Sequence, residues 1–415
     1  MGPRTSRDDA MQARYLGLAP MRVLRQMRRV WYVAGCTAAI VCLIISWEPS
    51  QIEQVRTAFD KLLLVLGSDA PGHGFDVLDG EIDRDYSMAY AMAAIACSRM
   101  YSATQDQVYL NIAVTCADWL ADHRDLDADA FIGWGLPITV ATDAGEYPAF
   151  HEYNITTAFA ILGLTETAAV ADSVHELSQQ AAEYRSTALA AAITLIERGC
   201  FARFPDGGIA FWYSCMLRDE DYIAPNVTAV MSAALCAAAA IAPAEQASVL
   251  RALADGGVRF LLSAVRVGSD GSWSWDYRVG ETVQRYTQDL VHSGYTAWGL
   301  AEYAMRGGAL ASRVERKRIV AFLDHYKIPS FMGRSRLDSR QAEVRLWDVA
   351  FEIAARARWS DSAPNLRGAF HSARLLQEST GTFRFSLSDA SFYVRAEAAM
   401  LLGLADYYVY LIGTG

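Results

Sequence analysis

Helical sequence patterns follow one another along almost the whole chain after residue 50, and this succession limits the possible folds most strongly. The segments are rich in Ala, Leu, Arg and Glu and carry apolar residues at three- and four-residue spacings, whereas strand signals are almost absent. The predicted helices cover residues 50–67, 84–101, 105–122, 153–171, 176–198, 226–241, 244–266, 289–306, 312–326, 341–358, 364–378 and 389–411. Their connections alternate between short turns and long loops rich in aromatic residues and glycine. This alternation favours helical hairpins arranged in a ring.

Three of the long loops share a pattern that indicates an internal repeat. Trp212 precedes Asn226, at the start of the next helix, by the same spacing that separates Trp275 from Asp289. An earlier copy carries Trp134 and reaches its helix after a longer gap. We therefore predict an all-α fold, an (α/α)6 toroid over residues 50–411. In a closed ring the starts of the inner helices gather at one end, so we expect the active site there, among the aromatic loops.

A second feature is the uncharged segment 30–47, VWYVAGCTAAIVCLIISW, which predicts one N-terminal transmembrane helix. Eighteen helical residues rise about 27 Å, which suits a bilayer core of roughly 30 Å. Residues 1–29 hold seven Arg against two Asp, so the positive-inside rule predicts a basic cytoplasmic segment and a translocated main domain. Scarce Lys and abundant Ala and Arg favour a bacterial inner membrane and a periplasmic domain. A cleaved signal peptide and a buried core helix are the alternatives.

Charge and cysteine usage exclude several classes of function. The net charge is −10 despite the basic start, which argues against a general nucleic-acid binder. The cysteines after the anchor fall singly, without a C-x-x-C pair, and we interpret them as small buried apolar residues. The acidic run 125–130, DLDADA, is interpreted as a solvated loop, and we expect no metal site and no cofactor.

Two segments resemble the (α/α) toroid superfamily of carbohydrate-active proteins, and within it the bacterial relatives of D-glucuronyl C5-epimerase. They are GEYPAFHEYNITTAFAILGL (145–164) and WDYRVGETVQRYTQDLVHSGYTAWGLAEY (275–303). The first is similar to the family's Glu-Tyr-Pro stretch before a helix, and the second to its aromatic loop before a helix that begins with Asp-Leu and His. The resemblance implies a uronate-polymer enzyme, with Glu146 and Tyr147 at the Glu-Tyr positions. The β-rich N-terminal domain of the animal epimerases has no counterpart in this sequence.

The candidate catalytic residues stand at two predicted helix starts. Asp289 and His292 share one face of a first helical turn, where a carboxylate fixes the tautomer of an imidazole that acts as an acid or base; a helix cap is the alternative role of Asp289. In the other loop, Glu152 and Tyr153 lie nearer the helix start than Glu146 and Tyr147, and both pairs stay open as candidates.

Aromatic, amide and arginine side chains of the long loops form the predicted substrate-binding set. Aromatic rings stack on sugars, and guanidinium groups bind carboxylates in pairs of hydrogen bonds. The set contains Trp134, Trp212, Tyr213, Asn226, Trp275, Tyr277, Arg218, Arg278, Arg285 and Tyr295.

These observations predict a membrane-anchored enzyme that modifies a polysaccharide, as a uronate C5-epimerase or lyase that abstracts a proton. A glycoside hydrolase on the same fold is the first alternative, with Asp289 paired with Glu152 or Asp276 as its two carboxylates. A non-catalytic glycan-binding subunit of a polysaccharide export or assembly complex is the second.

Overall fold

The computed structural model describes residues 50–78, 80–142, 145–216, 223–279, 287–324 and 344–414. The chain divides into two units, Met1–Gln54 and Val55–Gly415, and the description below concerns the second. The predicted basic segment 1–29 and the anchor 30–47 lie outside the described residues, so both stay predictions.

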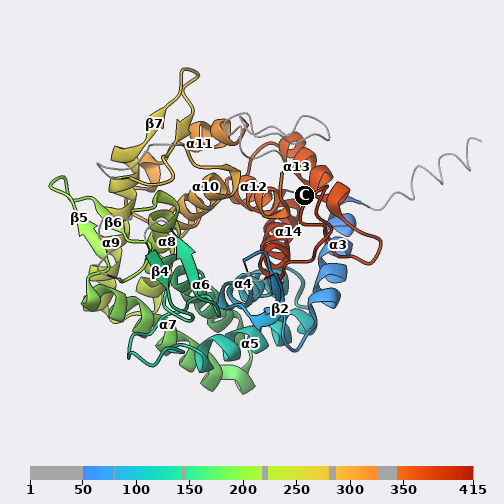
Figure 1. Ribbon diagram of the computed structural model, residues 1–415, viewed down its shortest axis with the longest axis horizontal. Coiled ribbons are helices and arrows are strands. Elements are labelled where there is room, and N and C mark those ends of the chain that lie inside the picture. Colours follow the sequence, from blue (N-terminus) through green and yellow to red (C-terminus); the bar gives the residue numbers. More distant parts are fainter. Residues whose placement is uncertain are drawn as a thin grey trace, which may run out of the picture. The chain divides into compact units, whose positions relative to one another are not determined.

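Six helices form the inner wall of a ring (Figure 1). They are α4 (Ser87–Thr104), α6 (Asn154–Ala171), α8 (Pro225–Ile241), α10 (Leu290–Met305), α12 (Leu346–Arg358) and α14 (Val394–Thr414). Each packs against the next in this order, and α14 packs against α4, which closes the ring. The predicted toroid of helical hairpins is confirmed.

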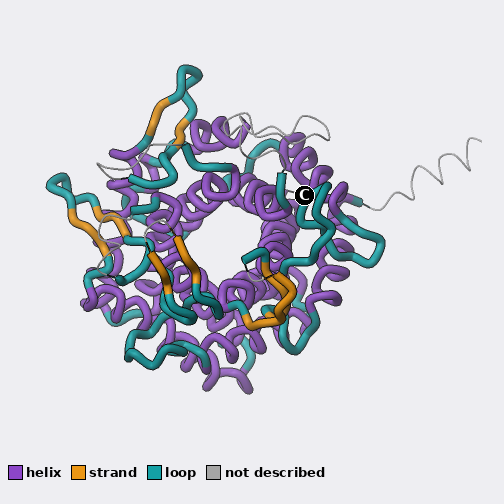
Figure 2. Tube along the Cα trace, viewed as in Figure 1, coloured by secondary structure: helices purple, strands orange, loops and turns teal. Residues whose placement is uncertain are grey.

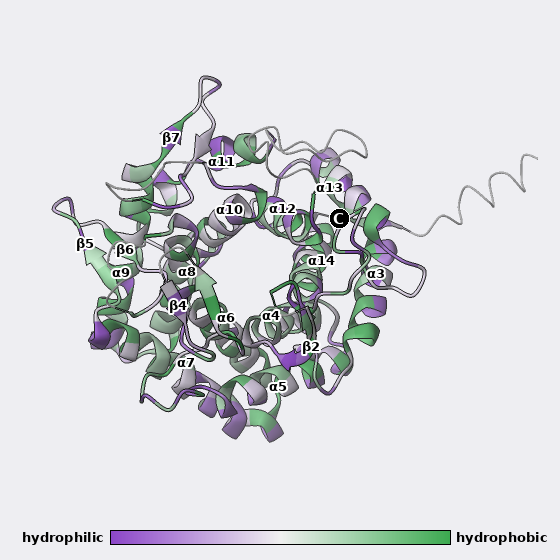
Figure 3. Ribbon diagram, in the orientation of Figure 1, coloured by the Kyte–Doolittle hydropathy of each residue, from purple (hydrophilic) through white to green (hydrophobic). Residues whose placement is uncertain are grey.

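Outer helices surround this wall; α3 precedes the first inner helix, and each of the others lies in sequence between two inner ones. They are α3 (Gln51–Leu66), α5 (Gln107–Asp122), α7 (Ser178–Arg198), α9 (Ala244–Ala264), α11 (Arg316–Leu323) and α13 (Ala363–Leu376), with short 3-10 turns at His175–Leu177 and Ala311–Arg313. Their inward faces are apolar and their outward faces are polar (Figure 3). Inner helices are buried on all sides and use small residues to approach closely: a Cβ at Gly299 of α10 would lie 2.6 Å from the backbone of Ala229 of α8.

The loops that lead into inner helices are long and carry four two-stranded antiparallel sheets (Figure 2). The pairs are β1 (His73–Asp76) with β2 (Gly80–Asp85), β3 (Val140–Thr142) with β4 (Gly145–Tyr147), β5 (Phe201–Arg203) with β6 (Ile209–Phe211), and β7 (Arg266–Val267) with β8 (Trp273–Ser274). The expectation of almost no strands was wrong here, because such short strands show little alternation of apolar and polar residues. We call the end of the ring that carries these loops the long-loop end.

Helix α6 is the one described helix that is long and apolar enough to cross a membrane, and 78% of its apolar window is buried inside the protein. Its place in the inner wall explains this composition, because every face of an inner helix meets other helices.

The cysteine prediction holds in part. Cys97, Cys116 and Cys236 are buried and free, as expected for small apolar residues. Cys200 and Cys215, however, form a disulfide with Cα atoms 4.9 Å apart. The error arose because these two residues are distant in sequence and meet only when the β5–β6 hairpin folds back on the following loop.

Candidate active site

Three long loops are joined to one another by backbone hydrogen bonds at the long-loop end. Asn154 N donates to Tyr213 O at 3.1 Å, which links the start of α6 to the loop before α8. Val279 N donates to Ile223 O at 2.9 Å, which links that loop to the one before α10. The starts of α6, α8 and α10 and the side chains around them are therefore held in a fixed arrangement.

The most chemically distinctive group stands at the start of α10. Asp289 is the N-cap: its Oδ1 accepts from the backbone N of His292 at 3.0 Å and lies 2.5 Å from Nδ1 of the same histidine. Burial alone would raise the pKa of Asp289, but His292 and Arg345 hold it well below its usual range. The carboxylate therefore stays ionised and favours the tautomer with the proton on Nδ1, which leaves Nε2 of His292 as a base.

Helix α12 completes this group. Arg345, its N-cap, donates to Asp289 Oδ2 at 3.2 Å and to Asp348 at 3.0 and 3.1 Å. Asp348 also accepts from the backbone N of Val291 at 3.1 Å. We call Asp289, His292, Arg345 and Asp348 the long-loop cluster. It fixes the starts of α10 and α12 relative to each other and orients the imidazole.

Aromatic side chains surround His292. The ring of Tyr277 meets it edge-on with centroids 4.6 Å apart, and Tyr295 lies 6.2 Å away. Burial raises the pKa of Tyr295, so its hydroxyl keeps its proton and is a hydrogen-bond donor at neutral pH. This hydroxyl and the indole N–H of Trp347 are both buried without a hydrogen-bond partner.

A further arginine joins α14 to this end. Arg395 binds Asp76 of β1 through both its Nε, at 2.6 Å, and a terminal nitrogen. Its guanidinium lies over the rings of Trp347, at 4.9 Å, and Tyr86, at 5.5 Å. The starts of α4, α12 and α14 thus meet around one buried cation.

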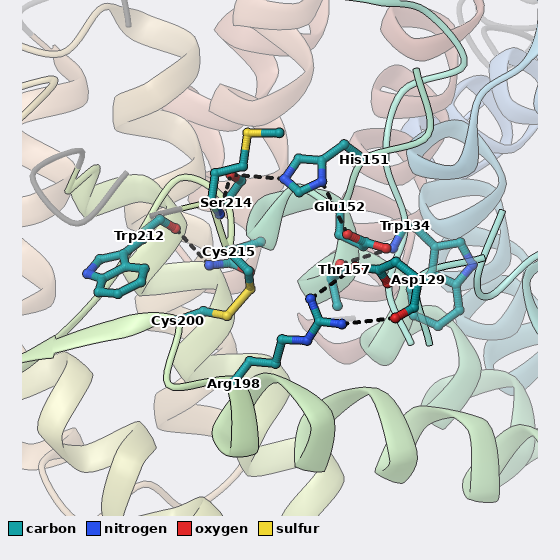
Figure 4. The surroundings of a disulfide bond; sticks show 12 residues. Asp129, Trp134, His151, Glu152, Thr157, Arg198, Cys200, Trp212, Ser214 and Cys215 are labelled. Atoms are coloured by element: carbon teal, nitrogen blue, oxygen red, sulfur yellow. Dashed lines mark hydrogen bonds and ion pairs between the residues drawn. A yellow bond between two sulfur atoms is a disulfide. The ribbon is translucent and has the colours of Figure 1, made fainter. Parts of the chain in front are cut away.

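A second aromatic group lies at the start of α6, beside His151 and Ser214, which Figure 4 shows facing each other. The rings of Tyr147, Tyr153 and Tyr213 contact one another with centroids 5.2–5.7 Å apart. His151 lies beside Tyr153 at 6.4 Å, and its Nε2 is 3.2 Å from Ser214 Oγ. The predicted residues Tyr147, Tyr153 and Tyr213 are therefore brought together.

The two predicted glutamates of this region differ in position. Glu146 is exposed on β4, whereas Glu152 is buried against the acidic run after α5. Asn226 is buried in the first turn of α8, and its Oδ1 has no hydrogen-bond partner. Asn154 is likewise buried at the start of α6, where its Nδ2 donates to Trp212 O at 2.9 Å.

Two predicted sugar-stacking residues belong to the packing instead, which corrects the expectation. Trp134 and Trp275 are each 2% exposed. Their indole N–H groups donate to carbonyls at the ends of outer helices, Leu120 at 3.0 Å and Leu261 at 2.9 Å. Neither ring presents a face to a ligand. The indole of Trp212 is partly exposed, and in Figure 4 it points away from His151.

The repeat register also needs a correction. Thr157 Oγ1 accepts from Trp134 N, and Thr228 Oγ1 accepts from Phe211 N, each at 3.1 Å. Both threonines lie in the second turn of their helices, so Phe211, rather than Trp212, is the counterpart of Trp134. The alignment of the repeats on their tryptophans, which the equal spacing in the sequence suggested, was therefore shifted by one residue at Trp212.

The remaining predicted residues are three arginines and one aspartate. Arg218 and Arg285 lie outside the described residues. Arg278 is partly buried in the loop before α10, and Asp276 pairs with Arg266 at 2.7 Å.

Sequence reasoning missed Ser214, Arg345, Asp348, Trp347 and Arg395. For Arg345 and Asp348 a signal existed, because their i,i+3 spacing matches an N-cap followed by an acidic third residue. The others carry no local pattern.

Comparisons with known proteins agree with this architecture. No profile of a known protein family and no curated protein sequence matches the chain. Among solved structures, a D-mannose isomerase aligns with a TM-score of 0.60 at 12% identity, over 88% of this chain and 100% of its own. A polysaccharide lyase aligns with a TM-score of 0.56 at 14% identity, over 88% of this chain and 99% of its own. The cellobiose 2-epimerase of Spirochaeta thermophila DSM 6192 aligns with a TM-score of 0.56 at 12% identity, over 88% of this chain and 100% of its own. The chain thus has the (α/α) toroid fold of these sugar-processing enzymes.

Proposed function

We propose that the chain is a polysaccharide-modifying enzyme that abstracts a proton from a uronate residue, as a C5-epimerase or a lyase. The observation that carries this proposal is the pairing of Asp289 with His292 at the start of α10. It supplies an imidazole that is oriented by a carboxylate, at the end of the ring where the inner helices begin. The solved structures with this fold include an epimerase and a lyase, which supports this class of chemistry.

The proposed step uses Nε2 of His292 as the base. It takes the proton from C5, and the electron pair of the C5–H bond moves into the neighbouring carboxyl group, which becomes enolate-like. The proton of the Tyr295 hydroxyl is retained at neutral pH, so this group stabilises negative charge by donating a hydrogen bond. Return of a proton to the opposite face of C5 gives epimerisation. Departure of the C4 oxygen with a proton gives elimination.

The carboxylates that the hydrolase alternative requires contact other charged groups. Asp289 is bound by His292 and Arg345, and its pKa is held too low for a general acid. Asp276 is paired with Arg266. Glu152 lies with the acidic run after α5. A hydrolase needs two carboxyl groups that flank one bond, and each of these three lies against other charged groups instead.

We further propose that the domain is periplasmic, held at the inner membrane by residues 30–47, and that it works beside polysaccharide synthesis or export proteins. The disulfide between Cys200 and Cys215 supports the location, because such bonds persist in oxidising compartments.

The test uses the full-length chain in detergent, incubated with uronate polymers in deuterium oxide. Deuterium at C5 indicates epimerisation, and a new absorbance near about 235 nm indicates an unsaturated uronate from elimination. Either signal should be lost with His292→Gln and kept with His175→Gln, which changes an exposed histidine. New reducing ends without either signal would indicate hydrolysis, and binding without turnover would indicate a scaffold; both results would overturn the proposal.

A further inference from the structure

The loop that follows α5 curls its carboxylates around one point. Asp125, Asp127 and Asp129 alternate along it, and Asp125 Oδ1 accepts from Asp129 N at 3.1 Å. Ala128 and Ala130 hold left-handed backbone angles, φ 58° and 68°. Such angles disfavour any residue with a Cβ, so this backbone course is maintained despite its cost. An exposed acidic loop of this kind is no evidence for a ligand by itself.

An independent observation comes from Glu152, which belongs to the segment just before α6. Its side chain is 1% exposed, and its Oε1 has no hydrogen-bond partner. One oxygen from Glu152 and one from each of the three aspartates lie within 4.8 Å of one another. The buried Glu152 carboxylate therefore lies among the carboxylates of the acidic loop, and one of its oxygens has no hydrogen-bond partner.

The charges around this point do not balance. Among the described residues, the loop's one cationic partner is Arg198, which donates to Asp129 Oδ2 at 3.0 Å and to Asp129 O at 3.1 Å. Glu152, buried beside the loop, has His151 Nδ1 3.5 Å from its Oε2. Four carboxyl groups gathered this closely repel one another when ionised unless a cation lies between them.

We propose that Asp125, Asp127, Asp129 and Glu152 bind a calcium ion. Calcium takes carboxylate oxygens at about 2.3–2.6 Å in flexible geometry, so oxygens on opposite sides of the ion are separated by about 4.6–5.2 Å. All four oxygens lie within 4.8 Å of one another, so one calcium ion can contact each of them. Magnesium demands near-ideal octahedral geometry at about 2.0–2.1 Å and usually keeps several waters. Zinc prefers nitrogen and sulfur ligands, and here one imidazole, that of His151, stands beside four carboxyl groups.

Calcium at this point links two parts of the long-loop end. It ties the loop after α5 to the segment that leads into α6. His151 Nδ1 lies 3.5 Å from Glu152 Oε2, and His151 also contacts Ser214. The ion therefore also fixes the surroundings of the Tyr147, Tyr153 and Tyr213 rings.

The test is calorimetric titration of the full-length chain in detergent, stripped with EDTA and exchanged into metal-free buffer. Calcium chloride should bind once per chain, with a Kd between about 1 μM and 1 mM. At saturation the melting temperature should rise by about 3–6 °C. Glu152→Gln and Asp127→Asn should each weaken binding at least about tenfold, whereas Asp172→Asn, an exposed carboxylate paired with Arg185, should not.

Asp127 is exposed, so its variant answers the question even if Glu152→Gln does not fold. No calcium binding by the wild type up to about 10 mM would overturn the proposal, since this exceeds the weakest known protein sites. Equal calcium affinity in wild type and Asp127→Asn would overturn it too. Tighter binding of zinc or magnesium at the same residues would overturn the assignment of the ion.

Discussion

The two ends of the helical ring bury charged side chains in opposite ways. We call the end opposite the long-loop end, where the inner helices finish, the short-loop end. Three arginines and three acids from five inner helices form one group there, which we call the short-loop cluster: Arg99, Glu166, Glu302, Arg306, Arg358 and Asp406. Each of these charges faces an opposite charge. At the long-loop end, the long-loop cluster is paired internally, but Asn226 Oδ1 and Glu397 Oε2 are buried without a hydrogen-bond partner.

The difference separates scaffold from site. Buried charges that lie near opposite charges hold helices in place, although Arg306 Nε of the short-loop cluster is also buried without a hydrogen bond. Buried polar atoms without partners cost free energy unless something else satisfies them, so they indicate where a polar ligand binds. We therefore expect the short-loop end to stabilise the ring and propose that the long-loop end binds the substrate.

The largest expected effect is on stability and comes from Arg99→Met. Arg99 binds Glu166 at 2.7 Å and Glu302 at 2.9 Å and also contacts Asp406. Its removal leaves buried carboxylates uncompensated, so the free energy of unfolding should fall by about 3–5 kcal/mol in chemical denaturation. Turnover of the protein that remains folded should change little, because the cluster lies at the other end.

The matched control is Arg185→Met, which breaks an exposed pair with Asp172 and should cost less than about 1 kcal/mol. Equal effects of the two substitutions would remove the stabilising role of the short-loop cluster.

His292→Gln should lower turnover and leave stability nearly unchanged, which is the reverse of the effect expected for Arg99→Met. Turnover should fall by about 10²–10⁴-fold, because the substitution removes a general base. The melting temperature should stay within about 2 °C of the wild type, since the side chain is 24% exposed and makes one strong polar contact. Loss of folding rather than turnover would assign His292 to the scaffold and end the contrast between the two ends.

A smaller effect is expected from the disulfide behind Ser214. Replacing both Cys200 and Cys215 by Ala opens a loop with a sequence separation of 15 residues. The free energy of unfolding should fall by about 2–3 kcal/mol, as expected for a loop of this size. The same change should follow when the wild type is reduced with dithiothreitol. An unchanged unfolding curve in both cases would show that the bond does not hold the loops of the long-loop end.

The contrast also explains what the sequence could predict. Helix positions and the alternation of loop lengths depend on neighbouring residues, so they were predicted closely. Asp289 and His292 were found for the same reason, since they lie in one helical turn. The partner Arg345 lies 56 residues from Asp289, and Arg395 lies 319 residues from Asp76. Such pairs form only after the ring closes, and no local sequence pattern predicts them.

The prediction that Trp134 and Trp275 stack on sugars was wrong for a related reason. An aromatic residue in a glycine-rich loop has the same sequence signature whether its ring stacks on a sugar or packs under a helix. The indole bonds of Trp134 and Trp275 to outer-helix carbonyls decide the matter, and they require the loop to fold back on the preceding helix.

The smallest effect, and the sharpest test of the contrast, is the pH dependence of two fully buried glutamates. Glu302, in the short-loop cluster, is desolvated, but Arg358, Arg99 and Arg306 lower its pKa. Glu397, on α14, accepts from Phe383 N at 2.9 Å through one oxygen, and burial raises its pKa well above the usual value. The two residues should therefore respond to pH with opposite signs.

A carboxyl group with a raised folded pKa stabilises the protein fully below its unfolded pKa of about 4.3 and loses that contribution as pH rises. Relative to Glu397→Gln, the wild type should lose about 1–3 kcal/mol of unfolding free energy between about pH 5 and 8. Glu302 contributes above about pH 4.3 and loses its contribution as pH falls further, so the advantage of the wild type over Glu302→Gln should shrink in acid. Parallel stability curves for the wild type and both variants would mean that the two ends hold their charges alike, and the assignment of scaffold and site by unmatched polar atoms would fail.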